Sequence, residues 1–143
     1  MGTTERERGQ ALVEFSLTIV IFLVLLMAIV DLGRGIYMFN GVSEATREIA
    51  RVTSVHQGSA FGNSAQTAAV VNTQKGLIPN LGNPTFACVD MTDTAVPLEG
   101  GKCPANEGNR VKVTIVAPYR PVTPVMGLIG TWNMSSTSSL EIP

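Results

Sequence analysis

Apolar residues are distributed very unevenly along the chain. The uncharged run FSLTIVIFLVLLMAIV extends from Phe15 to Val30, and a mostly apolar stretch that begins at Ala11 precedes it. A helix of about 20 residues, rising about 1.5 Å per residue, is roughly 30 Å long and matches the hydrocarbon core of a bilayer. The pattern therefore predicts a membrane-spanning helix over about residues 11–30.

The helical pattern changes its character after this run. Gly33, Gly35 and Gly41 weaken the helix, because each glycine costs about 1 kcal/mol in a helix interior relative to alanine. Beyond them, apolar residues recur every three or four positions and form one stripe: Val42, Ala45, Ile49 and Val52. We therefore expect a long N-terminal helix over residues 10–57, with an apolar transmembrane half and an amphipathic half whose stripe packs against another part of the protein.

The rest of the chain predicts short elements of both kinds. A second helix is expected over residues 64–77. RVKVTIVA, at 110–117, alternates apolar and polar residues and predicts a strand, as does TWNMSSTSSLEIP at 131–143, while TFACVDM at 85–91 is a weaker candidate. A loop before the last strand is indicated by three prolines: Pro118, Pro121 and Pro124. The expected fold class is α+β, with an antiparallel sheet of about three strands.

The charge balance gives no reason to expect nucleic acid as a partner. The chain has 143 residues, of which 15% are charged, and its formal net charge is -1. Nucleic-acid binding depends on clustered lysine and arginine, which this composition does not provide. The length suits one compact domain plus an anchor.

A cleaved secretory signal peptide is the main alternative to a spanning helix. Arg6 and Arg8 supply a positive n-region, but the apolar run is long for a signal peptide, and the exit sequence AIVDLGR lacks a small-x-small cleavage site. Arginines also follow the run, at Arg34 and Arg47, so the positive-inside rule does not decide the topology.

The two cysteines bear on the compartment. Cys88 and Cys103 both lie in the polar C-terminal portion. Their spacing suits one disulfide that closes a loop of about 15 residues and contributes roughly 3 kcal/mol in the chain-entropy model. Such a bond would place this portion outside the cytoplasm. The alternative is two unrelated free thiols.

Residues suited to catalysis or metal binding are sparse. His56 is the sole histidine and is expected at a helix end beside glycines, where a solvated or capping role is favoured. No serine or cysteine has a visible base. Asp90, Asp93 and Glu99 lack the alternating spacing of a calcium loop, which indicates a solvated loop, with weak calcium binding as the alternative. We therefore expect no enzyme activity, no catalytic residue, no cofactor and no metal site.

Glu14 stands at the edge of the apolar run, in the stretch RGQALVEF. A carboxylate at the centre of a bilayer costs at least a few kcal/mol, so its placement calls for a reason. One interpretation is that Glu14 reaches the headgroups and meets the positive end of the helix dipole.

The N-terminal stretch supports a second interpretation. RGQALVEFSLTIVIFLVLLMAIVDLGR, followed by Tyr37 and SEATREIAR, resembles the TadE-like pseudopilins of the tight-adherence (Tad) pilus system, part of the type IV pilus superfamily. The resemblance covers about the first 50 residues. It consists of a hydrophilic leader, a glycine, four residues, a glutamate and an aromatic residue, and then the apolar run. The aromatic position is often tyrosine in these proteins and is Phe15 here.

The resemblance implies processing and partners. In that family a prepilin peptidase cuts after the glycine, so cleavage is expected between Gly9 and Gln10, leaving Glu14 fifth and Phe15 sixth in the mature chain. The new amine on Gln10 can pair with the Glu14 carboxylate, in its own chain or in a neighbour. Expected partners are the peptidase, other pilin or pseudopilin subunits, the Tad assembly machinery and the membrane, with adhesion as the wider role.

The resemblance also implies a domain plan and a topology. Residues 1–9 would be a cytoplasmic leader, 10–57 the long helix and 58–143 an exported α+β head. The protein would be anchored once in the cytoplasmic membrane and would then be available for incorporation into an extracellular pilus. The alternative is a permanently anchored single-pass protein whose exported head binds a partner or surface. A mature N-terminus at Gln10 favours the first hypothesis, and an intact Met1 favours the second.

Overall fold

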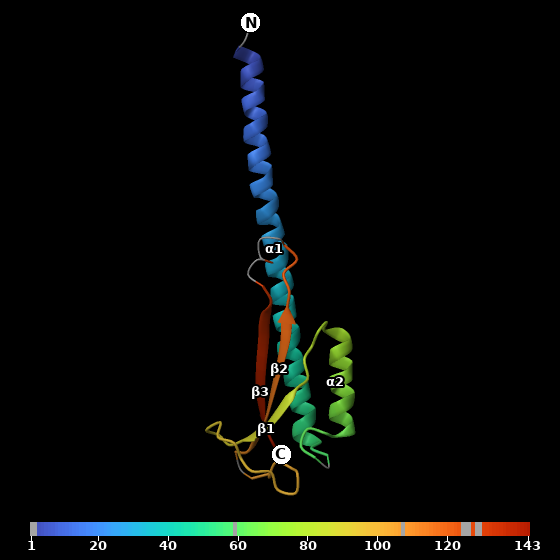
Figure 1. Ribbon diagram of the computed structural model, residues 1–143. Helices are drawn as coiled ribbons and strands as arrows, with labels where there is room; N and C mark the ends of the chain where they lie inside the picture. The colour runs from blue at the N-terminus through green and yellow to red at the C-terminus, as the bar shows by residue number, and fades with distance from the viewer. Residues whose placement is uncertain (1–2, 59, 107, 124–126, 128–129) are drawn as a thin grey trace. The chain divides into compact units, whose positions relative to one another are not determined.

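The computed structural model describes residues 3–58, 60–106, 108–123, 127 and 130–143 (Figure 1). The described part of the chain contains two helices and three strands in the order α1 (Thr3–Val55), α2 (Ala65–Leu77), β1 (Thr85–Val89), β2 (Arg110–Tyr119) and β3 (Trp132–Glu141). The strands form one antiparallel sheet in the order β1-β2-β3. The predicted α+β class, with a long apolar helix, a second helix and a three-stranded sheet, is confirmed.

The chain divides into two compact units, which are described separately. The N-terminal unit comprises Met1–Gly35 and Arg120–Thr131, and the sheet unit comprises Ile36–Tyr119 and Trp132–Pro143. Helix α1 contributes its first part to the N-terminal unit and its second part to the sheet unit.

Helix α1 runs without interruption through its three central glycines. A Cβ atom at Gly33 would meet no described atom beyond its own helical turn within 4 Å, so no other described segment packs against that position. A Cβ at Gly41, in contrast, would lie 3.4 Å from Cγ1 of Ile78. An added Cβ would thus be in ordinary van der Waals contact with Ile78, which packs beside the helix at this point.

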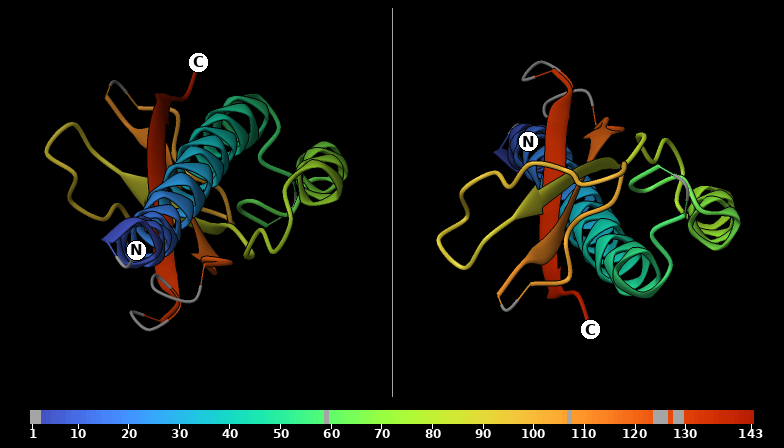
Figure 2. Two further views of the ribbon diagram at one scale, coloured as in Figure 1. Left: turned by 90° about the horizontal axis from the view of Figure 1, so that it is seen from above. Right: turned by 90° about the horizontal axis from the view of Figure 1, so that it is seen from below.

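The core of the sheet unit is formed where the second part of α1 covers one face of the sheet (Figures 1 and 2). The predicted stripe supplies Val42, Ala45 and Ile49, all fully buried. The alternating face of β2 meets it with four fully buried residues: Val111, Val113, Ile115 and Ala117. Complete burial of a side chain such as Ile49 contributes about 1.5–3 kcal/mol, so this contact is the main apolar stabilisation of the unit.

Helix α2 begins after a cap that also ties it to α1. The Oγ atom of Ser64 accepts a hydrogen bond from the backbone N–H of Thr67 at 3.0 Å, which satisfies one of the free donors of the first turn. The hydroxyl of Thr67 lies 3.2 Å from that of Thr53 on α1, in a buried position. The helix ends at Leu77, two residues before Pro79.

Pro118 corrects one detail of the sequence interpretation. It was expected in the loop, but it lies inside β2, opposite Asn133 of β3. Strand β1 pairs with β2 only as far as Thr114, so this end of β2 has a strand partner on one side only. A proline is tolerated there because its missing N–H is not needed by a second neighbouring strand.

Candidate functional site

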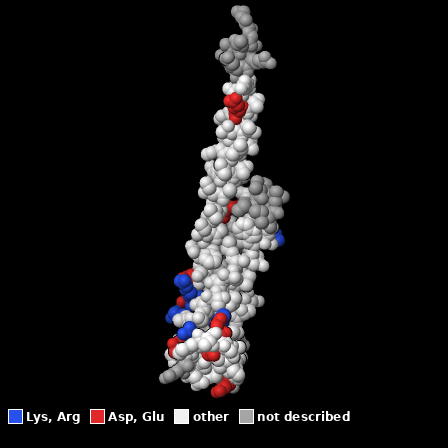
Figure 3. Space-filling view, turned by 90° about the vertical axis from the view of Figure 1, so that its left-hand side faces the viewer, with Lys and Arg blue, Asp and Glu red and all other residues white. Residues whose placement is uncertain are grey.

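The apolar run of α1 is exposed on all sides in the N-terminal unit. Leu17 is 67% exposed and Ile29 is 71% exposed, and the large apolar residues between them are also exposed apart from Ile19, which is half-buried. No charged residue interrupts the segment from Phe15 to Val30, which leaves a white stretch on the surface in Figure 3. Within the described residues, one helix, Gly9–Val55, is long and apolar enough to cross a membrane. The chain therefore carries an N-terminal helix suited to single-pass membrane anchoring.

The few hydroxyl groups in this run are satisfied by the helix itself. Ser16 Oγ donates a hydrogen bond to the carbonyl oxygen of Val13, and Thr18 Oγ1 donates one to that of Glu14, both at 2.8 Å. Such local bonds remove the cost of placing a hydroxyl among apolar neighbours. They make the segment compatible with a lipid environment.

The predicted cleavage position lies on an open part of α1. Gly9 and Gln10 are both helical and exposed. A Cβ atom at Gly9 would meet nothing within 4 Å. Neither packing nor backbone conformation therefore requires glycine at this position, where it costs the helix about 1 kcal/mol relative to alanine. The described residues therefore give no structural reason for glycine here.

Glu14 lies one helical turn after Gln10, on the same side of α1. The Nε2 atom of Gln10 donates a hydrogen bond to Oε1 of Glu14 at 3.1 Å. Phe15, the neighbouring aromatic residue, is 66% exposed. In the intact chain the backbone nitrogen of Gln10 belongs to a peptide bond, so the predicted pairing between a Gln10 amine and the Glu14 carboxylate stays a prediction.

Asp31 is a structural site that the sequence interpretation missed. It follows the apolar run directly, and only 3% of its surface is exposed. Its Oδ2 atom accepts a hydrogen bond from the backbone N–H of Thr123 at 2.8 Å, and its Oδ1 atom accepts one from that of Val122 at 3.0 Å. The guanidinium of Arg34 lies 3.5 Å from the same carboxylate. Asp31 thus holds the beginning of the β2–β3 connection against α1.

The predicted cysteine pair is present in the sheet unit. Cys88, in β1, and Cys103 form a disulfide with a Cα–Cα distance of 5.5 Å. Both are buried, and the backbone N–H of Cys103 donates to Oε1 of Gln57 at 2.7 Å. The disulfide therefore links β1 to the long β1–β2 connection, and the hydrogen bond to Gln57 holds this point just beyond the end of α1.

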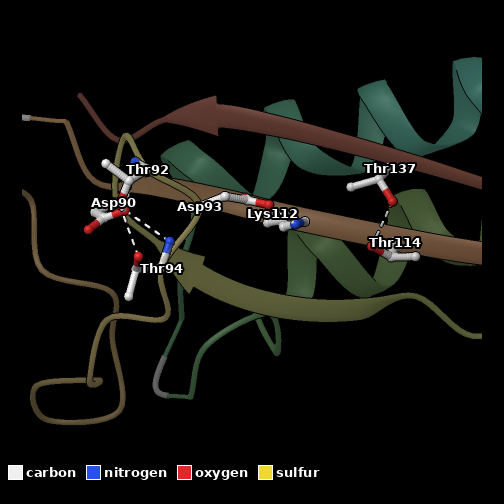
Figure 4. Close-up of polar contacts among 7 residues, drawn as sticks. All are labelled: Asp90, Thr92, Asp93, Thr94, Lys112, Thr114 and Thr137. Atoms are coloured by element: carbon white, nitrogen blue, oxygen red, sulfur yellow. Dashed lines mark hydrogen bonds and ion pairs between the residues drawn. The ribbon is translucent and has the colours of Figure 1, made fainter.

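Asp90 organises the turn that follows β1 (Figure 4). Its Oδ1 atom accepts hydrogen bonds from the hydroxyl and the backbone N–H of Thr92, each at 2.7 Å, and from the backbone N–H of Thr94 at 2.9 Å. The bond from the Thr92 hydroxyl is the main reason why the pKa of Asp90 lies below its usual value, followed by the bond from the Thr94 backbone. This carboxylate is engaged in folding its own turn.

The outer face of the sheet beside this turn is polar. Asp93 forms an ion pair with Lys112 of β2, and the hydroxyls of Thr114 and Thr137 lie 3.0 Å apart across β2 and β3 (Figure 4). Among the described residues no group of three His, Cys, Asp or Glu side chains is placed to hold a metal ion.

Comparison with known proteins gives a match in the N-terminal region. Residues 9–51 match the family model described as TadE-like protein, which confirms the resemblance over this part of α1. Searches of curated proteins and of solved structures gave no significant match. The family match and the exposed apolar helix together support a pilus-related membrane protein.

Proposed function

We propose that this TadE-like chain is a pseudopilin, a structural subunit or assembly component of a Tad or type IV-like pilus that a prepilin peptidase cleaves after Gly9. The observation that carries the proposal is the extent of the family match. The match begins at Gly9, the expected cleavage residue, and continues along the exposed apolar helix to residue 51.

The exposed run of α1 suits a subunit that changes its surroundings. A helix that is apolar on every side is stable in lipid or when packed among similar helices. Because the described residues leave most of the run uncovered, we assign its partner to lipid or to other subunits. A subunit that first spans the cytoplasmic membrane and then packs among the helices of other pilin subunits satisfies this requirement at both stages.

Gly9 supports processing at this position. The fold gives no packing reason for a glycine there, since a side chain would extend into open space. A peptidase that must approach the backbone closely on either side of the cleaved bond gives such a reason. The prepilin peptidase is therefore a partner in the proposal.

Glu14 supports a role after cleavage. The 3.1 Å contact between the side chains of Gln10 and Glu14 places the two residues on one side of the helix. Once cleavage has created an amine on Gln10, the carboxylate can pair with that amine in its own chain or in a neighbouring subunit. Neither charge then remains alone in an apolar setting.

The disulfide supports export of the head. Bonds between cysteines persist in oxidising compartments and are rare in the cytoplasm. The Cys88–Cys103 bond therefore favours an orientation with the leader in the cytoplasm and the head outside it. This orientation also brings Gly9 to the cytoplasmic side, where the peptidase acts in the proposal.

Substitution of Gly9 tests the processing step. We expect Gly9→Leu to leave the fold intact, because a side chain there meets no described residue. We expect it to abolish cleavage, because the peptidase must approach the backbone closely at this position. Gly76→Leu is the matched control, since a Cβ at Gly76 in α2 also meets nothing within 4 Å. Mass spectrometry of the membrane fraction should find the Gly76 variant trimmed to Gln10 and the Gly9 variant uncut. Equal trimming of both would contradict processing after Gly9, and an uncut wild-type protein would favour permanent anchoring.

Substitution of Glu14 tests the assembly step separately. We expect Glu14→Gln and Glu14→Ala to insert and to be cleaved, but to be depleted from sheared filaments, because the amine of Gln10 loses its partner. Glu44→Ala is the control on the same helix, where the side chain is also exposed. Filament yields equal to wild type for both Glu14 variants would leave Glu14 as a tolerated charge at the membrane edge.

A further inference from the structure

The groove beside Asp31 is an apolar surface where the end of the apolar run meets the β2–β3 connection. It lies in the N-terminal unit and has a volume of about 340 Å³. Its lining is contributed by α1 and by the start of the β2–β3 connection: Met27, Val30, Asp31, Arg34, Val122 and Thr123. The two segments are joined by the backbone hydrogen bonds that the Asp31 carboxylate accepts from Val122 and Thr123.

Val122 is exposed although its backbone is firmly held. Its amide donates to the buried carboxylate of Asp31, yet 72% of its surface is accessible. Met27 and Val30, on the facing helix, are also exposed. A polar anchor therefore holds an apolar side chain outward, next to the last residues of the apolar run.

The accessible charge beside the groove is positive, which suits a lipid phosphate. Asp31 is the first charged residue after the run, and its carboxylate accepts hydrogen bonds from the backbone. Arg34 is 52% exposed on its side chain, so its guanidinium remains accessible at the rim of the groove. By sequence, the segment from Arg120 to Thr131 contains no aspartate, glutamate or lysine. Arginine at the end of a membrane span commonly reaches lipid headgroups.

We propose that Val122 and this groove lie in the lipid–water interface and hold a bilayer phospholipid, with an acyl chain against Met27, Val30 and Val122 and the phosphate beside Arg34. The proposal rests on the membrane anchoring in the proposed function and adds a second membrane contact to it. Continuity argues for lipid as the occupant, because the groove is lined by the last turn of the apolar run and the first turn beyond it. An apolar surface in that position borders the bilayer wherever the run itself spans it.

Tryptophan fluorescence can test the depth of Val122. The chain has a single tryptophan, Trp132, so a Trp132→Phe background allows one probe at a time. We would place tryptophan at position 122, at position 25 within the apolar run, and at position 55 at the exposed end of α1. Each full-length variant would be reconstituted in phosphatidylcholine–phosphatidylglycerol vesicles at low protein-to-lipid ratio, with and without lipid brominated in the upper part of the acyl chains.

The probes give different expected results. Val122→Trp and Leu25→Trp should each lose about half of their fluorescence with brominated lipid, whereas Val55→Trp should be quenched by aqueous iodide instead, as expected for a residue outside the bilayer. Adding Asp31→Ala to the Val122→Trp variant should restore its fluorescence toward that of Val55→Trp and leave Leu25→Trp unchanged.

Two outcomes separate the inference from its premise. If the probe at 25 is quenched by lipid while the probe at 122 responds only to iodide, the groove does not hold lipid and the membrane anchor stands. If the probe at 122 is shielded from both quenchers, another protein surface covers the groove and the inference fails. If the probe at 25 is not quenched by lipid, the anchor and the inference fail together.

Discussion

The two parts of helix α1 differ in where their apolar residues find a partner. In the first part, residues 12–30, large apolar side chains point in all directions and none of the most apolar 18-residue window is buried. In the second part, residues 42–54, the apolar side chains form one stripe, and Val42, Ala45 and Ile49 are fully buried. One continuous helix thus presents two kinds of surface.

The difference shows what the periodicity of apolar residues encodes. A one-sided stripe needs one partner, and the chain supplies it as the buried face of β2. An all-round apolar surface needs surroundings on every side, which the described residues do not supply. The first part is therefore built for lipid or for other helices, and the second part for the chain's own sheet.

The largest expected effect on stability comes from truncating a buried side chain in the apolar stripe of α1. Ile49→Ala should lower the free energy of unfolding of the sheet unit by about 2–5 kcal/mol, because it removes a fully buried side chain and leaves a cavity. Leu25→Ala, in the exposed run, should leave that free energy unchanged. Urea unfolding in detergent, followed by the fluorescence of Trp132, would measure both. A loss of similar size for Leu25→Ala would contradict the division of α1.

The disulfide should have the next largest effect. Replacing Cys88 and Cys103 together by alanine should lower the free energy of unfolding by roughly 3 kcal/mol, since the bond closes a loop of about 15 residues. The effect should appear in the sheet unit and leave insertion of the apolar run unaltered. Alkylation followed by mass spectrometry supplies the control, because wild-type protein recovered without reductant should contain no free thiol. Two free thiols in that sample would contradict the bond.

Asp31 should have a smaller and local effect. Asp31→Asn should weaken the hydrogen bonds to Val122 and Thr123 by about 1–3 kcal/mol, because a charged acceptor is replaced by a neutral one. Hydrogen exchange at these two amides should speed up accordingly, while exchange in β2 stays as in wild type. Asp93→Asn, at an exposed position, is the control. Unchanged exchange at both amides would show that the carboxylate does not hold this connection.

The smallest effect concerns pH and the Asp90 turn. The pKa of Asp90 is held below its ordinary value of 3.8 by the Thr92 hydroxyl and the Thr94 and Thr92 amides. A depressed pKa in the folded state means that the stabilisation is present at neutral pH and is lost as the pH falls through about 4 and below. The stability difference between wild type and Asp90→Asn should therefore shrink between pH 6 and pH 3 in urea titrations. A difference that grows on acidification would reverse the assigned sign.

The periodicity of apolar residues and the local capping and turn residues predict most of the fold. The apolar run, the stripe in α1 and the alternation in β2 each follow from spacings within a few residues, and Ser64 marks the start of α2 in the same way. The spacing of Cys88 and Cys103 suggested their pairing on similarly local grounds. Such features depend on near neighbours, which a single sequence displays.

The remaining features depend on contacts that no local pattern displays. Asp31 finds its partners, Val122 and Thr123, more than 90 residues later in the chain. Its one sequence signal was a lone carboxylate directly after an apolar run. The sequence places Pro118 in a loop because proline usually ends a strand. Its place in β2 is tolerated because β1 does not extend that far along the sheet. Both features require the tertiary arrangement.

The N-terminus of protein recovered from surface filaments tests the central claim most directly. Filaments would be sheared from cells, purified and subjected to N-terminal sequencing and mass measurement. The account predicts a chain that begins at Gln10, with Glu14 as its fifth residue, because cleavage after Gly9 precedes packing of the apolar run among other helices. Protein found only in the membrane fraction, with Met1 and the leader intact, would contradict it.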